Sequence, residues 1–135
     1  HMEAPSLDRD IQFLKHKIEN GATYIVTQMF FDNQKYFDFV DKCRKAGITV
    51  PIIPGLKPIA TKKQLNIIPH RFHVDLPESL ILEIIKCKTN EQVKQVGIEW
   101  CIQQSQALKQ ANIPVLHYYS MGKSYNIKTI ASSVF

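Results

Sequence analysis

Apolar residues recur at the spacing of an amphipathic helix at the start of the chain, namely at Leu7, Ile11, Leu14 and Ile18. Ser6 can cap the start of this helix, and Asn20-Gly21 supplies a stop signal. The next segment, residues 23–31, is rich in β-branched and aromatic residues and does not alternate strictly between apolar and polar side chains. We therefore expect a helix over residues 7–18, followed by a strand that is covered on both faces.

A second helix and a second strand are predicted next. Asp32-Asn33 can cap a helix that ends at Ala46-Gly47, and the strand is expected around residues 49–53. Because Pro51 and Pro54 have no N–H group to donate to a ladder, this strand should be short. A loop is expected from Pro54-Gly55 to Pro58 or Ala60. The buried stripe of the helix is expected to contain Tyr36, Phe37, Phe39, Val40 and Cys43.

Residues 61–112 carry only helical signals, in a short piece over 61–68, another over 78–86 and a long one over 90–111. Thr89 and Gln92 form a capping box for the long helix, and Pro114 ends it before a third strand over 115–119. A closing helix is expected from residue 124 onward. The broad buried face of the long helix is expected to contain Val93, Val96, Trp100, Cys101, Gln104 and Leu108.

The order of these elements predicts an α/β fold, with right-handed βα units on a parallel sheet. Both a doubly wound sheet and a TIM barrel fit this order, and three strands are a little under half of a barrel. Residues 1–135 are expected to form a single partial domain, without internal repeats or linkers.

Composition narrows the class of protein. The 44% hydrophobic and 21% charged residues are typical of a soluble globular chain. No apolar run approaches the roughly 20 residues that span a membrane, and the N-terminus lacks the features of a signal peptide, so a cytoplasmic protein is expected. Three cysteines without a Cys-x-x-Cys pair argue against a disulfide framework and a cysteine zinc site, and we expect them to be reduced and buried.

Charge and motifs leave other classes open but give them little support. The lysines behind the net charge of +5 are scattered over helix-like segments and form no run, which favours solvated helix faces over attraction of anionic cofactors and argues against nucleic-acid binding. The five glycines form neither a GxGxxG motif nor a P-loop, which counts against a doubly wound nucleotide-binding module without catalysis. His70 and His73, with Asp75 nearby, have a spacing open to zinc, but no further metal motif follows and no metal is expected.

Two motifs, in order on successive predicted strands, resemble the signatures of the methylenetetrahydrofolate reductase family. Residues 27–32 read Thr-Gln-Met-Phe-Phe-Asp, and residues 51–59 read Pro-Ile-Ile-Pro-Gly-Leu-Lys-Pro-Ile. The similarity extends from His1 to Tyr119. It implies that the chain is the C-terminal portion, with about three strands, of a TIM (β/α)8 barrel that holds FAD at its C-terminal mouth. It also implies the flavin-dependent reduction of 5,10-methylenetetrahydrofolate to 5-methyltetrahydrofolate with NAD(P)H, in one-carbon metabolism.

The resemblance assigns substrate contacts to four residues. Gln28 is implied to bind the folate pterin and the nicotinamide in turn, since its amide both donates and accepts; the alternative is a buried glutamine bonded to backbone. Gln64 is implied to contact folate, with a plain surface position as the alternative. Lys123 stands where the family can carry an arginine, so it keeps the charge but not the bidentate fork. Tyr119 can line the folate pocket, although one of Tyr118 and Tyr119 must face the surrounding helices.

Flavin contacts are implied for residues near the N-terminus. Lys17 can meet the FAD pyrophosphate as a point charge, and Asp10 can accept from a flavin or ribose hydroxyl, with a helix surface as the alternative for both. His16 departs from the basic residue, often arginine, of the family. His1 and Ala4 complete the set, although His1-Met2 also resembles the remnant of an expression tag.

The family's proton-donating glutamate and an acidic residue near the flavin belong to segments outside this chain. We therefore expect no catalytic residue in the chain and no reductase activity from it alone. Three parallel strands leave two open edges, so we expect the chain to pair with the missing N-terminal half of the barrel or with another copy of itself.

Overall fold

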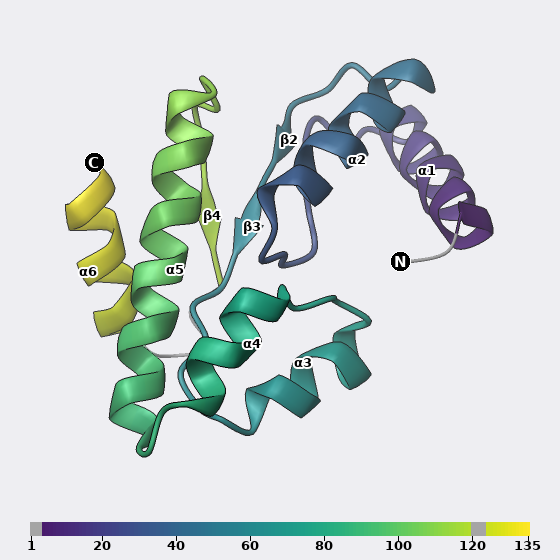
Figure 1. Ribbon diagram of the computed structural model, residues 1–135. Helices are drawn as coiled ribbons and strands as arrows, with labels where there is room; N and C mark the ends of the chain where they lie inside the picture. Colours follow the sequence, from purple (N-terminus) through teal and green to yellow (C-terminus); the bar gives the residue numbers. More distant parts are fainter. Residues whose placement is uncertain (1–3, 120–123) are drawn as a thin grey trace.

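The computed structural model describes residues 4–119 and 124–135, and only the backbone of residues 4–8 and 124–126. Helices alternate with short strands, as the sequence predicts (Figure 1). In chain order the elements are α1 (Ala4–Glu19), β1 (Ile25–Val26), α2 (Asn33–Lys45), β2 (Ile52–Ile53), β3 (Gly55–Leu56), α3 (Gln64–Phe72), α4 (Glu78–Ile85), α5 (Asn90–Gln110), β4 (His117–Tyr118) and α6 (Ser124–Val134).

The strands pair in parallel, β1 with β2 and β3 with β4. β2 and β3 are two parts of one extended segment that Pro54 interrupts, because proline has no N–H group to donate. The Pro54 carbonyl still accepts from His117 N at 3.0 Å. This segment therefore lies between β1 and β4. The expectation of a loop from Pro54-Gly55 onward is wrong, since Gly55 and Leu56 form β3.

Each strand is shorter than predicted, with two paired residues. Single hydrogen bonds extend the ladders slightly: Thr27 N donates to Ile53 O at 3.0 Å, and Tyr119 N donates to Leu56 O at 2.8 Å. Prolines at positions 51, 54 and 114 limit further pairing, because none of them can donate.

Helices α2 and α5 cover one face of the strands. Ile25, Ile52 and Leu56 belong to a hydrophobic cluster that also contains Tyr36 of α2 and Cys101 of α5. The Tyr36 hydroxyl donates to Ile52 O at 2.6 Å, which ties α2 to β2. α6 packs on α5 from the outside, with Ile130 fully buried in the same cluster.

The opposite face of the strands is much more exposed, and we call it the open face. Strand alternation places on it Tyr24, Val26, Gln28, Ile53, Gly55, Lys57, Val115, His117 and Tyr119. Tyr24 and Val115 are 57% and 52% exposed, while Val26 and Ile53 are half-buried. The expectation of a first strand covered on both faces is therefore wrong for the part of the chain that the structure describes, because its helices pack closely on one face only.

A second hydrophobic cluster lies beyond the C-terminal ends of the strands. It joins Met29, Phe31 and Ile59 to apolar residues of α3, α4 and the first half of α5. Gly97 of α5 allows the helix to lie directly on the backbone of Ile59, since a Cβ atom there would stand 1.8 Å from Ile59 O. α3 extends to Phe72, past its predicted end, and contains Pro69.

Capping residues in the sequence predict where α2 and α5 begin, but not where α1 begins. The Asp32 side chain accepts from Gln34 N at 3.0 Å, as the predicted cap of α2 should. Thr89 Oγ1 accepts from Gln92 N at 3.2 Å, whereas Gln92 reaches back to Lys88 N at 2.6 Å and not to the backbone of Thr89. The cap proposed for α1 is wrong: the helix begins at Ala4, so Ser6 lies inside its first turn.

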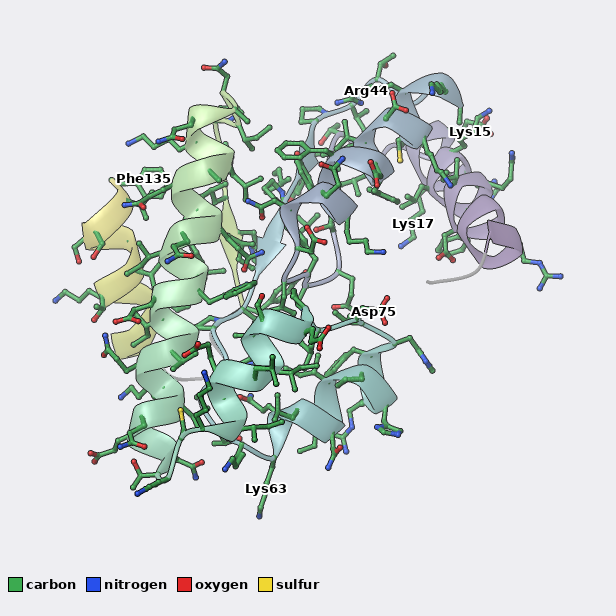
Figure 2. The ribbon with its side chains drawn as sticks, in the orientation of Figure 1. Lys15, Lys17, Arg44, Lys63, Asp75 and Phe135 are labelled. Carbon is green, nitrogen blue, oxygen red and sulfur yellow. The ribbon has the colours of Figure 1, made fainter. Side chains whose placement is uncertain are left out.

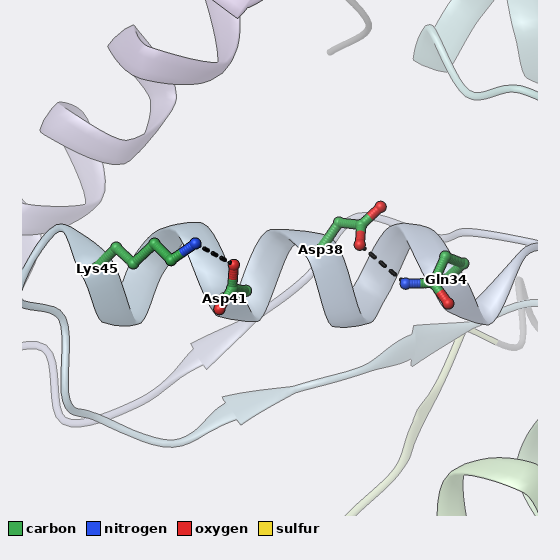
Figure 3. Close-up of polar contacts among 4 residues, drawn as sticks. All are labelled: Gln34, Asp38, Asp41 and Lys45. Carbon is green, nitrogen blue, oxygen red and sulfur yellow. Dashed lines mark hydrogen bonds and ion pairs between the residues drawn. The ribbon is translucent and has the colours of Figure 1, made fainter.

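Polar contacts also organise the outside of α2. Arg44, labelled in Figure 2, donates to Ile48 O at 2.9 Å and to Val50 O at 2.7 Å and so holds the turn that leads into β2. Figure 3 shows two contacts at i,i+4 spacing: Gln34 donates to Asp38 at 2.9 Å, and Lys45 pairs with Asp41 at 2.9 Å. Such exposed pairs contribute little stability and are typical of a solvated helix face.

Candidate functional site

Three residues of interest follow the C-terminal ends of neighbouring strands: Gln28 after β1, Lys57 after β3 and Tyr119 after β4. Because the strands are parallel, these positions lie at one edge of the sheet. Ligands of parallel α/β folds bind at this edge. It is therefore the candidate site.

Gln28 is exposed among the described residues, and its side chain is bonded to backbone, as the alternative interpretation expected. Its Oε1 accepts from Met29 N at 3.0 Å, which orients the side chain from its own backbone. Within the described residues, Nε2 has no hydrogen-bond partner. The site thus presents an oriented amide donor at the end of β1.

Tyr119 crosses the middle strand on the open face. Its hydroxyl donates to Thr27 O at 2.8 Å, next to Gln28, and Thr27 Oγ1 accepts from Gly55 N at 2.9 Å. The ring occupies the space above Gly55, where a Cβ atom would be 2.6 Å from Tyr119 Cε2. Burial raises the pKa of the Tyr119 phenol, which keeps the donating proton in place. Tyr119 and Gln28 are therefore brought together by Thr27.

Tyr118 faces the other way, as the alternation of a strand requires. Its hydroxyl lies 2.7 Å from Ser105 Oγ of α5, in the cluster under the helices. The prediction that one of the two tyrosines packs against the helices is thus confirmed, and Tyr118 is the one.

Lys57 was not singled out by sequence reasoning, yet only 7% of its surface is exposed. Its ammonium makes no hydrogen bond or ion pair with any residue that the structure describes. Burial lowers the pKa of Lys57 as a consequence. The signal that could have found it is a single lysine inside the otherwise apolar motif at residues 51–59.

Gln64 has a structural role that the sequence did not indicate. Its half-buried side chain accepts from Ala60 N at 2.6 Å and from Thr61 N at 3.0 Å. These bonds close the loop between β3 and α3. Gln64 is therefore not a plain surface residue.

The residues proposed for flavin form a separate group on α1, which lies across the molecule from α5 in Figure 1. Asp10 is half-buried, and His16 is exposed with its ring 3.3 Å from Asn20 Nδ2. Lys17, labelled in Figure 2, places its ammonium 4.8 Å from the Phe13 ring centre. Ala4 is the first residue of α1. His1 and Lys123 lie outside the described residues.

Hydrogen bonds from α5 hold the end of β1 in place. Trp100 Nε1 donates to Phe31 O at 2.8 Å, and Gln104 Nε2 donates to Phe30 O at 3.1 Å. Gln104 also exchanges hydrogen bonds with Asn33 at the start of α2. These contacts fix the backbone that carries Gln28. The residues of these contacts also line an open groove of about 380 Å³, which does not include Gln28, Lys57 or Tyr119.

All three cysteines are free and buried, as predicted. Burial raises the pKa of the Cys101 thiol to about 12. No group of three possible metal ligands occurs among the described residues, and His70 instead places Nδ1 2.8 Å from Asn66 O. No helix in the described ranges is long and apolar enough to cross a membrane.

Comparison with known proteins gives one consistent result. A family model described as methylenetetrahydrofolate reductase matches residues 1–134. A probable methylenetetrahydrofolate reductase (NADPH) of Caenorhabditis elegans is 34% identical over 99% of this chain and 20% of its own length. The 5,10-methylenetetrahydrofolate reductase of Salmonella typhimurium is 33% identical over 92% of this chain and 42% of its own length. The chain thus spans less than half the length of these relatives.

A solved structure has a similar fold. It is described as "Uncharacterized protein from Clostridium thermocellum binds two copies of 5-methyl-5,6,7,8-tetrahydrofolic acid". The similarity covers 92% of this chain and 46% of that chain, with a TM-score of 0.56 and 19% sequence identity. At this identity the similarity concerns the fold.

Proposed function

Because the chain belongs to the methylenetetrahydrofolate reductase family, we propose that it is the C-terminal portion of a barrel that reduces 5,10-methylenetetrahydrofolate to 5-methyltetrahydrofolate. FAD supplies the hydride chemistry when bound, with NAD(P)H as the donor. The observation that carries the proposal is the exposed, oriented amide of Gln28 at the end of β1, inside a motif that resembles the family's. The name of the solved structure of similar fold, which binds a methylated folate, is consistent with a folate substrate.

The open face supports a partial barrel. A TIM barrel covers the outer face of its strands with helices and buries the inner face among the side chains of other strands. Here α2 and α5 cover one face, while Tyr24 and Val115 leave apolar surface exposed on the other. Strands from the rest of the protein would bury that surface and pair with the open edges.

In this proposal the residues of the chain bind and orient the ligands. Gln28 Nε2 would donate to a ring carbonyl of the pterin or to the exocyclic carboxamide oxygen of the nicotinamide, whichever occupies the site. Tyr119 forms the wall beside it. The exposed ammonium of Lys17 fits the FAD pyrophosphate, and Asp10, His16, His1 and Ala4 complete the flavin set. Gln64 and Lys123 are the further folate contacts.

The first test is retention of flavin. The protein is mixed with excess FAD, unbound FAD is removed, and the visible absorption spectrum is recorded for the chain alone and with the rest of the barrel supplied. We expect NADH-dependent folate turnover only in the second case. Folate turnover by the chain alone would refute the proposal that its site is partial.

Gln28→Ala then tests the central residue in the complete protein. It removes the amide and should lower folate turnover strongly, while FAD retention stays unchanged because Gln28 is not among the proposed flavin contacts. Gln106→Ala, an exposed change on α5, serves as the matched control. Unchanged folate turnover in Gln28→Ala would contradict the proposal.

Light scattering tests whether the chain alone pairs with another copy of itself. A stable monomer would count against self-association through the open edges.

A further inference from the structure

Lys57 directly follows β3, which lies between the strands β1 and β4 that precede Gln28 and Tyr119. Leu56 is fully buried in the cluster under α2 and α5, so its neighbour Lys57 points to the opposite side of the ladder. The bond from Tyr119 N to Leu56 O shows that the ladder continues to this point. The Tyr119 ring above Gly55 marks the same face independently.

The described residues around Lys57 give its ammonium no partner. The side chain is 7% exposed, and no described residue accepts a hydrogen bond from it or forms an ion pair with it. Another lysine nearby, Lys62, instead donates to Cys87 O at 2.9 Å. The aliphatic stem of Lys57 is thus covered, while its ammonium is not among the described side-chain atoms that are both fully buried and without a hydrogen-bond partner. Among the described residues, Lys57 is therefore a cation left available to a ligand at the site.

We propose that Lys57 donates a charge-assisted hydrogen bond to a carbonyl or anionic oxygen of the ligand that binds beside Gln28. This inference rests on the proposed function. The amide of Gln28, the ammonium of Lys57 and the ring of Tyr119 follow three adjacent strand segments and form a row along the site. The pterin and the flavin both carry carbonyl oxygens that an ammonium can bind, and an ionised donor makes the stronger kind of hydrogen bond.

The test uses the complete protein and two probes, FAD and 5-methyltetrahydrofolate, with dissociation constants measured for each. Lys57→Met keeps the length of the side chain and removes the charge, and Lys57→Arg keeps the charge. Lys42→Met, an exposed change on α2, is the control. We expect Lys57→Met to weaken binding of one probe by about tenfold or more, and Lys57→Arg to restore part of the loss. The probe whose binding is weakened shows whether the oxygen that Lys57 contacts belongs to the flavin or to the folate.

The pH profile separates binding from a structural role. Wild-type affinity should fall as the pH rises through the pKa of Lys57, because the ammonium loses its charge, and this fall should vanish in Lys57→Met. The other titratable groups of the open face among the described residues are Tyr24, His117 and Tyr119. They are present in both proteins, so their contributions cancel when the two pH profiles are compared.

The outcomes are distinct. Equal affinities and equal pH profiles in wild type and Lys57→Met would overturn the inference and leave the proposed function standing. A loss that Lys57→Arg does not reduce and that does not depend on pH would assign Lys57 a structural role and also overturn it. A wild-type protein that binds neither probe would remove the proposed function, and the inference with it.

Discussion

Replacing Gly97 by alanine should destabilise the protein, although alanine is the better helix former. Gly97 is buried in the middle of α5, and a Cβ atom there would stand 1.8 Å from Ile59 O, 2.8 Å from Ile59 C and 2.9 Å from Ile59 N. All three are backbone atoms, so no side-chain rotation relieves the overlap. The helix and the strand end must separate by about 1.2 Å to reach even the closest tolerated contact.

Two effects of opposite sign decide the magnitude. Alanine in place of glycine stabilises a helix by about 1 kcal/mol. Forcing a methyl group into a packed interior costs about 1 to 3 kcal/mol or more. The separation also strains the bonds from Trp100 to Phe31 O and from Gln104 to Phe30 O, each contributing about 1 kcal/mol. We expect a net loss of about 2 to 3 kcal/mol in the free energy of unfolding.

The assay follows the fluorescence of Trp100, the single tryptophan, during unfolding in urea. Trp100 lies on α5 one turn from Gly97 and reports directly on this contact. Gln106→Ala, an exposed change on the same helix, should alter stability by less than about 0.5 kcal/mol. A Gly97→Ala protein as stable as the wild type would refute the packing argument, since helix propensity would then outweigh the overlap.

Three further outcomes are expected. Gln64→Ala removes the acceptor for two backbone amides and should cost about 1 kcal/mol, whereas Gln64→Glu keeps it; urea midpoints of both variants check this. Tyr118→Phe loses one bond to Ser105, which keeps its bond to Cys101 O, so a measured loss above about 3 kcal/mol would contradict the assignment. Burial raises the pKa of Cys101 from 9.0 to about 12, so the stability it contributes is complete below pH 9 and lost as the pH rises toward 12. Unfolding of the wild type and Cys101→Ala across this range should show a smaller pH dependence in the variant.

The helices could be predicted because their signals are local. Asp32 and Thr89 cap α2 and α5 as expected, and apolar periodicity identified Cys43, Cys101 and Leu108 as buried. A cap or a helical stripe is determined by residues a few positions apart, which the sequence presents directly. The start of α1 was the exception, since Ser6 offered a plausible cap inside a longer helix.

The strands and the site depended on contacts between distant residues. Gly55 and Leu56 form a strand only because β4, about sixty positions later, supplies its partner. The bonds of Gln64 to the preceding loop and the crossing of Tyr119 over Gly55 likewise follow from the fold rather than from a local pattern. The burial of Lys57 was missed because a lysine is most often a surface residue.

The sequence pattern of the first strand fits an environment that the described residues do not provide. A strand with water on one face should alternate between apolar and polar residues, but residues 23–31 do not. In the structure Tyr24 is 57% exposed and Val26 is half-buried on the open face. The pattern therefore fits a protein in which this face is covered, and the cover is not formed by the described residues. This mismatch rests on Tyr24 and Val26 and not on Gln28, Lys57 or Tyr119, and it supports the proposal that the rest of a barrel completes the chain.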